Sequence, residues 1–176
     1  SEMCIRDRPW TLKFLWSPFL EMFKTKKFFV VLTQMVTGAG FALVALALQL
    51  PFFFAICIAL LAVIAFSGAT HDVATDGVYM SELNKQDQAK YIGWQGAFYN
   101  IAKIVASGGL VWLAGALLVG FGGVEGATEA VRHEATRHAW MTVMLILAAV
   151  MLLLGFYHMR MLPSGGAAAV SYTHLT

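Results

Sequence analysis

The sequence predicts an all-α membrane protein with four complete transmembrane helices and one truncated helix before them. Two observations support this fold class. Of the 176 residues, 59% are hydrophobic and only 12% are charged, and the mean hydropathy is +0.70, whereas a soluble domain carries about 25% charged residues. In addition, four apolar stretches each exceed the length of about 20 residues that a helix needs to cross the hydrocarbon core of a bilayer.

Short connections separate the four predicted transmembrane helices. The helices are residues 28–49, 52–83, 90–121 and 140–162. The first two are joined by a tight turn, the next two by the polar loop NKQDQAK at 84–90, and the last two by a longer connection of mixed charge at 122–139. Residues 10–23 are too short to cross a membrane alone, so we interpret them as the tail of a further helix.

The basic residues predict the orientation of these helices, because short cytoplasmic loops carry an excess of lysine and arginine. Six basic residues fall on one predicted side of the membrane: Lys24, Lys26, Lys27, Lys85, Lys90 and Arg160. Arg132 and Arg137 fall on the other side, among three glutamates. We therefore expect the loops 24–27 and 84–90 to be cytoplasmic.

The two ends of the chain are expected to be foreign to the protein. Residues 3–7 read MCIRD and residues 170–174 read VSYTH. The codons ATG TGT ATA AGA GAC encode MCIRD, and their reverse complement GTC TCT TAT ACA CAT encodes VSYTH. This inverted repeat is similar to the mosaic end of transposase-based sequencing adapters. We therefore assign residues 1–8 and 170–176 to adapter, 9–163 to a partial transmembrane bundle and 164–169 to the start of a linker.

The second predicted helix carries acidic residues inside an apolar segment. Its stretch SGATHDVATDGVYMSEL includes His71, Asp72 and Asp76, and an acid at the centre of a transmembrane helix costs about 2.5–3.5 kcal/mol on the mildest scale. Asp72, Asp76 and Tyr79 share one helical face, with His71 beside it. A helix of about 30 residues is about 45 Å long, against a hydrocarbon core of about 30 Å. The polar last third is therefore expected to border a wet, protein-lined space.

A matching polar stripe follows on the third predicted helix. Gln95, Tyr99 and Lys103 recur at every fourth residue. The pairs expected at equal depth, in an antiparallel hairpin centred near residue 87, are Asp72 with Lys103, Asp76 with Tyr99, and Met80 with Gln95. We predict that the two stripes face each other across a cavity. In such a cavity, burial disfavours the charged form of an acid, whereas the neighbouring charge of Lys103 favours it. An acid under these two opposing effects is suited to carry a proton.

Other interpretations of these residues stay open. A buried ion pair that only fastens two helices needs the same residues, although such pairs often stabilise no better than apolar packing. His71, Asp72 and Asp76 are suitable metal ligands, but no cysteine or second histidine converges on them, so no metal is expected. RHEATRH at 132–138 departs from the zinc motif H-E-x-x-H, because its histidines are five residues apart.

Several functional classes are not expected. The sequence contains no phosphate-binding loop, dinucleotide fingerprint or nucleophile elbow, so we expect neither an enzyme nor a bound cofactor. The net charge of +2, without a basic cluster, does not indicate a nucleic-acid partner.

Three segments resemble one family of transporters. KFLWSP at 13–18, SGATHDVATDGVY at 67–79 and SGGLVWLAG at 107–115 are similar to the AmpG-type muropeptide permeases and the related acetyl-CoA transporters, a branch of the major facilitator superfamily. The residues that match the family's fourth-helix pattern A-T-Q-D-x-x-x-D are Ala69, Thr70, His71, Asp72 and Asp76, with histidine in place of glutamine. The family's fifth-helix Tyr-Arg pair is Tyr99-Asn100 here, and the positive charge follows at Lys103.

The resemblance implies a fragment of the N-terminal six-helix bundle, from the end of helix 2 through helix 6. Helix 1 and the C-terminal bundle would lie outside this chain. It further implies proton-driven import of anhydro-muropeptides, or a related small solute, across the bacterial inner membrane by alternating access. The residues expected on the substrate or proton pathway are His71, Asp72, Asp76, Tyr79, Gln95, Tyr99 and Lys103, with Trp94 and Asn100 as candidate substrate contacts.

Two rival functions use the same residues. A non-transporting membrane subunit would bind a partner chain through these polar helix faces. An intramembrane enzyme would use His71 and Asp72 as acid–base groups, but the four predicted helices offer it no nucleophile at comparable depth.

Overall fold

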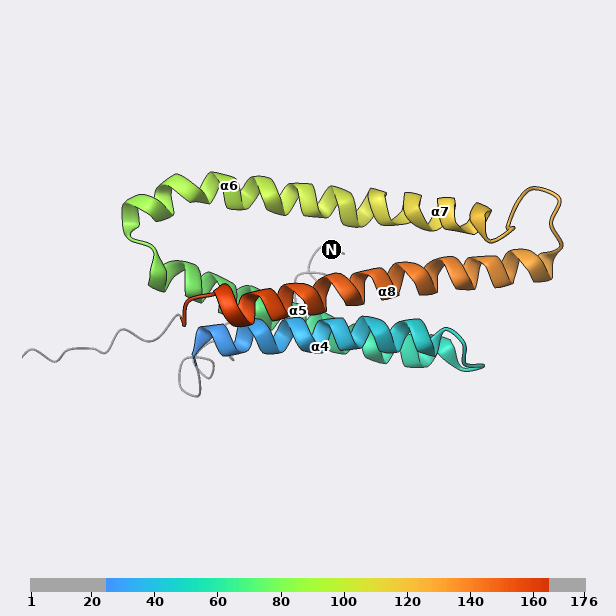
Figure 1. The fold of residues 1–176 in the computed structure, drawn as a ribbon, viewed down its shortest axis with the longest axis horizontal. Helices are drawn as coiled ribbons and strands as arrows, with labels where there is room; N and C mark the ends of the chain where they lie inside the picture. The colour runs from blue at the N-terminus through green and yellow to red at the C-terminus, as the bar shows by residue number, and fades with distance from the viewer. Residues whose placement is uncertain (1–24, 165–176) are drawn as a thin grey trace, which may run out of the picture.

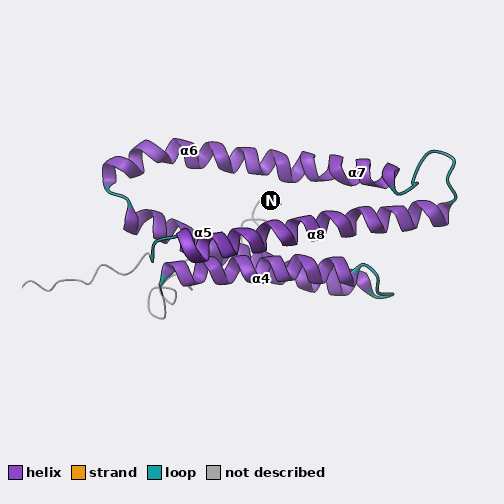
Figure 2. Ribbon diagram, in the orientation of Figure 1, coloured by secondary structure: helices purple, strands orange, loops and turns teal. Residues whose placement is uncertain are grey.

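The computed structural model describes residues 25–164, which are helical apart from short turns and contain no β-strand. The elements are α4 (Lys26–Ala47), α5 (Phe53–Glu82), α6 (Lys85–Ile104), the π-helical segment η1 (Val105–Gly109), α7 (Leu110–Gly120) and α8 (Glu129–Met161) (Figure 1, Figure 2). The expected helix tail at 10–23, Lys24, the adapter ends and nearly all of the linker at 164–169 lie outside the described residues.

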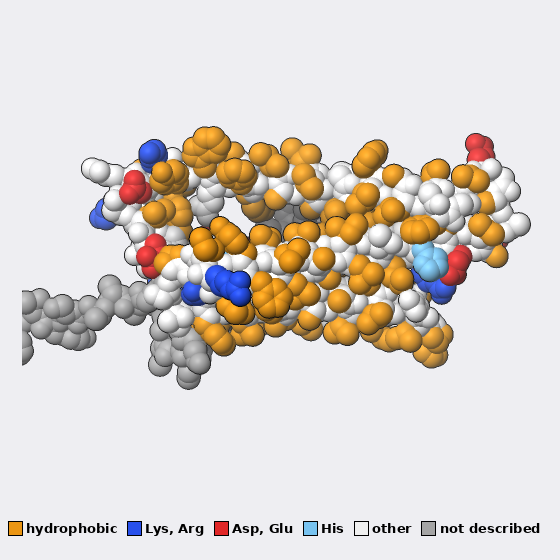
Figure 3. Space-filling model, viewed as in Figure 1, with side chains coloured by type: hydrophobic (Ala, Val, Ile, Leu, Met, Phe, Trp, Pro, Cys, Tyr) orange, Lys and Arg blue, Asp and Glu red, His pale blue; other side chains and the backbone are white. Residues whose placement is uncertain are grey.

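Within residues 25–164, four helical rods are long and apolar enough to cross a membrane: α4, α5, the continuous run α6–η1–α7 over residues 85–120, and α8. This confirms the all-α fold class and the four predicted transmembrane helices, and it indicates a multi-pass membrane protein. Hydrophobic side chains cover the length of the rods, and charged side chains gather near the two ends (Figure 3). A surface of this kind matches lipid, whose tails are as apolar as leucine.

The two predicted cytoplasmic loops are shorter than expected, because capping residues start the helices early. Asn84 begins α6, where its Oδ1 accepts from the Asp87 N–H at 2.9 Å and its Nδ2 donates to Asp87 Oδ2 at 2.7 Å. Thr25 begins α4 by accepting from the Phe28 N–H at 3.4 Å. A side chain that satisfies a free N–H in the first turn stabilises the helix start, so residues 85–90 are helical, and so are Lys26 and Lys27.

The helix α8 begins at Glu129, well before the predicted start at residue 140. Thr128 caps it by accepting from the Val131 N–H at 3.4 Å. Glu134 then pairs with Arg137 at 2.5 Å and with His138 at 3.0 Å. Pairs spaced three and four residues apart support a helix that protrudes into water. Much of the connection expected at 122–139 is therefore a polar extension of the last transmembrane helix.

The helix α4 lies between α5 and α8 and packs against both, so the first and last described helices are side by side (Figure 1). Glycines allow this close approach. A Cβ placed on Gly38 would lie 2.8 Å from Leu152 Cγ and 3.2 Å from the Ala148 carbonyl oxygen of α8, and one on Gly40 would lie 2.7 Å from Ile64 Cγ1 of α5. Small residues at such contacts bring transmembrane helices together.

The basic residues that were predicted on one side of the membrane can be compared with the ends of the helices. The backbone N–H of Lys27 donates to the Ser164 carbonyl oxygen at 3.3 Å, which returns the end of α8 to the start of α4. Lys26, Lys27, Lys85, Lys90 and Arg160 therefore share one end of the bundle, as the orientation argument expects.

The helix α6 stands apart from this packed layer. None of its residues is buried, whereas α7 returns to α8, where the rings of Phe121 and His138 have centroids 5.8 Å apart. The polar end of α5 and the polar face of α6 are consequently joined by a turn without being packed together along their length.

Replacement of Gly38 by Ala should lower the free energy of unfolding by about 1–3 kcal/mol, the usual effect of overpacking. The matched control is Gly68→Ala on α5, where a Cβ would meet nothing within 4 Å. Both changes gain the same helix propensity of about 1 kcal/mol, so their difference isolates the contact of Gly38 with α8. Reversible unfolding in mixed micelles, followed by tryptophan fluorescence, measures it. Equal stabilities of the two variants would contradict the close α4–α8 contact.

Candidate functional site

The candidate site is a pocket of about 310 Å³ between the polar half of α5 and α6. Its lining residues are His71, Asp72, Thr75 and Asp76 from α5 and Gln95 and Tyr99 from α6. Figure 3 shows the molecule hollowed between α6 and the helices beside it. The structure thus brings together most of the residues that the sequence places on a substrate or proton pathway, and it adds Thr75.

One hydrogen bond shows which residues of α5 and α6 lie at the same depth. Gln95 Nε2 donates to Asp76 Oδ1 at 3.3 Å, whereas the sequence paired Gln95 with Met80 and Asp76 with Tyr99. The predicted register is therefore corrected by about one helical turn. The cause is the early start of α6 at Lys85, which moves the centre of the hairpin toward the end of α5.

The corrected register moves Lys103, whose ammonium group was predicted beside Asp72, away from the pocket. Tyr99 shares the pocket lining with Asp72, and Lys103 lies a turn further along α6, exposed and outside the lining. The depth match of Asp72 with Lys103 was therefore wrong. Among the described residues, the pocket lining is two carboxylates, one imidazole and three neutral polar groups.

Tyr79 secures the turn between α5 and α6. Its hydroxyl donates to the Gln88 carbonyl oxygen at 2.7 Å. The Gln88 side chain in return donates from Nε2 to the carbonyl oxygen of Leu83 at 2.7 Å and to that of Met80 at 3.3 Å. Tyr79 thus shares a helical face with the acids but bonds to the hinge beside the pocket.

The two candidate substrate contacts lie on α6 outside the pocket lining. The ring of Trp94 stacks on Phe98 with centroids 6.1 Å apart, and both side chains are 63% exposed. Asn100 Nδ2 donates to the Gly96 carbonyl oxygen of its own helix at 2.9 Å.

Sequence reasoning missed a buried polar ladder between α4 and α5 that reaches the pocket at His71. Thr37 Oγ1 donates to Ser67 Oγ at 3.0 Å, and Ser67 Oγ donates to the Thr33 carbonyl oxygen at 3.0 Å. Thr33 Oγ1 lies 3.0 Å from His71 Nδ1. Thr33, Thr37 and Ser67 are all buried. The signal was present in the sequence, because each helix carries two polar residues four apart at matching depth.

A second buried polar contact joins α4 to α8. Gln34, only 3% exposed, has its Oε1 3.0 Å from His158 Nδ1. Since the amide oxygen accepts only, the histidine nitrogen donates. Thr33, Gln34 and Thr37 of α4 therefore each bond to a neighbouring helix.

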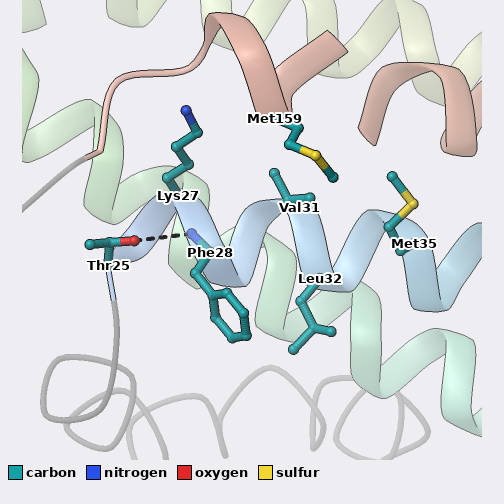
Figure 4. A pocket seen from close by; sticks show the side chains of 7 residues that line it. All are labelled: Thr25, Lys27, Phe28, Val31, Leu32, Met35 and Met159. Atoms are coloured by element: carbon teal, nitrogen blue, oxygen red, sulfur yellow. Dashed lines mark hydrogen bonds between the residues drawn. The ribbon is translucent and has the colours of Figure 1, made fainter. Parts of the chain in front are cut away.

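Another hollow, of about 410 Å³, lies on the side of α4 and α8 and is lined by Thr25, Lys27, Phe28, Val31, Leu32, Met35 and Met159 (Figure 4). Its lining is almost wholly apolar, and in Figure 4 the ammonium group of Lys27 points away from the apolar side chains. Among the described residues that line it, none carries a carboxylate or an imidazole. Within residues 25–164, no three histidine, cysteine or acidic side chains gather closely enough to hold a metal ion.

The fold and the pocket define a multi-pass α-helical membrane protein with an acidic pocket between two of its helices. No family model, curated protein or solved structure matches the chain.

The corrected register predicts which cysteine pairs will cross-link. In a cysteine-free background, the pair Asp76→Cys and Gln95→Cys should react rapidly with a short bifunctional reagent, because their side chains meet in the wild type. The control pair Asp72→Cys and Lys103→Cys should react slowly. Gel mobility after cleavage at a protease site inserted in the turn between Glu82 and Lys85 measures both, because only a cross-link keeps the two fragments together. Faster cross-linking of the control pair would restore the register expected from the sequence.

Proposed function

We propose that the chain is part of the N-terminal helical bundle of a proton-coupled secondary transporter that moves a small polar solute by alternating access. One observation supports this most strongly. The helices α5 and α6 turn polar faces toward a common pocket that holds Asp72, Asp76 and His71. Ionisable residues inside transmembrane segments are rare, and they mark substrate paths, ion paths and proton relays.

The depth of the pocket suits such a role. Asp72 lies ten residues before the end of α5 at Glu82, which is about 15 Å along the helix axis. The hydrocarbon core is about 30 Å thick. The carboxylate therefore reaches the interior of the membrane from the end of the bundle that carries Lys26, Lys27 and Lys85, which we assign to the cytoplasmic side.

The chemistry of the lining divides into proton-carrying and solute-binding groups. Asp72 and Asp76 supply two carboxylates, which are groups that proton relays use inside membranes. Asp76 already accepts a hydrogen bond from Gln95, and the ring of Tyr99 offers an apolar face with a polar hydroxyl, which is suited to a sugar or a peptide. The resemblance to AmpG-type permeases names anhydro-muropeptides as the solute and the bacterial inner membrane as the location.

The open side of α6 fits a pocket completed by further helices. Secondary transporters place the solute between two helical halves that move about a fixed site. Every residue from 89 to 109 is exposed, so both the polar and the apolar faces of α6 are available to such neighbours. In this proposal, helix 1 and the C-terminal bundle of the same protein cover them.

The exposure of α6 also favours a second candidate function, a non-transporting membrane subunit. Its face with Gln95, Tyr99 and Lys103 would then bind a separate membrane chain through hydrogen bonds. Such a subunit needs no proton exchange at Asp72 or Asp76, which separates the two candidates.

Replacement of Asp76 by Asn in the full-length reading frame should reduce uptake by about 10²-fold or more, as the loss of a proton-transfer group does. Uptake of radiolabelled anhydro-muropeptide into proteoliposomes, with simultaneous proton entry reported by a pH dye, measures it. The control Asp87→Asn removes the same charge from the first turn of α6, outside the pocket, and should leave uptake near the wild-type rate.

Two results would contradict the proposal. Proton-coupled uptake that persists in Asp76→Asn would remove the acidic pocket from the mechanism. A wild-type protein that transports no solute, but that copurifies in fixed ratio with another membrane chain, would establish the subunit function instead.

A further inference from the structure

We propose that Thr33 is a positioning residue that holds His71 in the tautomer with its proton on Nδ1, so that Nε2 is the atom that exchanges protons at the pocket. The tautomer follows from the geometry alone, whereas its use in transport rests on the proposed function.

The first step concerns the single hydroxyl proton of Thr33. Its Oγ1 lies 2.8 Å from the Phe29 carbonyl oxygen and 3.0 Å from that of Val30. Carbonyl oxygens only accept hydrogen bonds, so these two short contacts require the hydroxyl proton to point toward them. If the proton pointed to His71 instead, three oxygens would crowd together with no hydrogen between them.

The second step fixes the imidazole. Thr33 Oγ1 lies 3.0 Å from His71 Nδ1, and its proton is already committed to its own helix. The hydroxyl oxygen can therefore only accept at this contact, and Nδ1 must donate. The hydrogen bond at one ring nitrogen decides which nitrogen carries the proton. In neutral His71, Nδ1 is protonated and Nε2 has a free lone pair.

The third step is the rigidity of Thr33. Its backbone carbonyl oxygen accepts from Ser67 Oγ at 3.0 Å, and Ser67 accepts in turn from Thr37. Thr33 and Ser67 are 5% and 4% exposed, so water does not compete for these bonds. The close approach of Gly40 to Ile64 holds the two helices at this spacing. Thr33 therefore presents a fixed acceptor to the imidazole.

The consequence lies at the pocket. His71 forms part of its lining, while Nδ1 is turned to α4. Nε2 is the ring nitrogen that is not bonded to Thr33. A proton taken up from water at Nε2 gives an imidazolium that keeps its Nδ1–H bond to Thr33. Loss of that proton restores the same neutral tautomer, so the ring does not have to turn over in a transport cycle.

Among residues 25–164, titratable groups surround this imidazole on three helices. They are Asp72 and Asp76 on α5, Tyr99 on α6 and His158 on α8. On α4, the side chain of Lys26 lies along Gly77, more than a helical turn from His71. The two carboxylates are therefore the acceptors on its own helix to which an Nε2 proton can pass.

Nitrogen NMR of the whole chain in lipid nanodiscs, with ¹⁵N-labelled histidine, tests the tautomer. The His71 signals are identified by their loss in His71→Gln. In the wild type, neutral His71 should carry its proton on Nδ1, and acidification should add a proton at Nε2. A wild-type signal from the Nε2–H tautomer would overturn the proposal. The tautomer is read on the wild-type protein, and the variant His71→Gln serves only to assign the signals.

Variants separate the hydroxyl from mere packing. Thr33→Val keeps the shape but removes the acceptor, and the preference for the Nδ1–H tautomer should fall about tenfold, the value of one hydrogen bond. Thr33→Ser should preserve the wild-type signal. The control Thr70→Val removes a hydroxyl from α5 whose bond goes to Phe66 of the same helix, and it should change nothing at His71.

An unchanged spectrum in folded Thr33→Val would overturn the positioning role. The NMR readout requires no transport. Absence of solute uptake by the full-length protein would thus count against the proposed function, and the wrong tautomer against this proposal.

Discussion

The structure depends on one constraint: a polar group inside a membrane must find its partner within the protein, because lipid offers none. The helix α4 meets this constraint on two sides. Thr33 and Thr37 bond toward α5, and Gln34 bonds toward His158 of α8. These contacts need backbones at close range, which the glycines of α4 permit. The central place of α4 between its neighbours follows from these polar residues as much as from apolar packing.

The same constraint is met less fully on α6, and this is where a function can reside. Past its first two turns, the side-chain hydrogen bonds of α6 within residues 25–164 are those of Gln95 to Asp76 and of Asn100 to its own helix, while the surface around them stays exposed. A polar helix face exposed in this way needs water, a solute or further protein beside it. The contrast between α4 and α6 therefore separates the part of the chain that holds the bundle together from the part that faces the pocket.

Some features of this fold could be predicted from the sequence and others could not. The four long helices were predictable because hydropathy and length decide membrane crossing. The pocket residues of α5 and α6 were predictable because their spacing places them on single faces. The register was missed by a turn, since it depends on the cap at Asn84. The Thr33–His71 contact was missed because two threonines in an apolar helix leave its hydropathy high. Lys103 was wrongly placed in the site because of this error in the register.

The π-helical segment Val105–Gly109 explains how one continuous rod can border the pocket with α6 and pack on α8 with α7. It interrupts the run of residues 85–120 below the apolar α7, and Ser107 Oγ there donates to the Lys103 carbonyl oxygen at 2.8 Å. One extra residue in a turn rotates the helix beyond it by about 100° relative to the helix before it. The polar stripe of α6 therefore does not continue into α7. The face of the rod that packs on α8 is set apart from the face that borders the acids, so α6 can stand open beside α5 while α7 stays anchored.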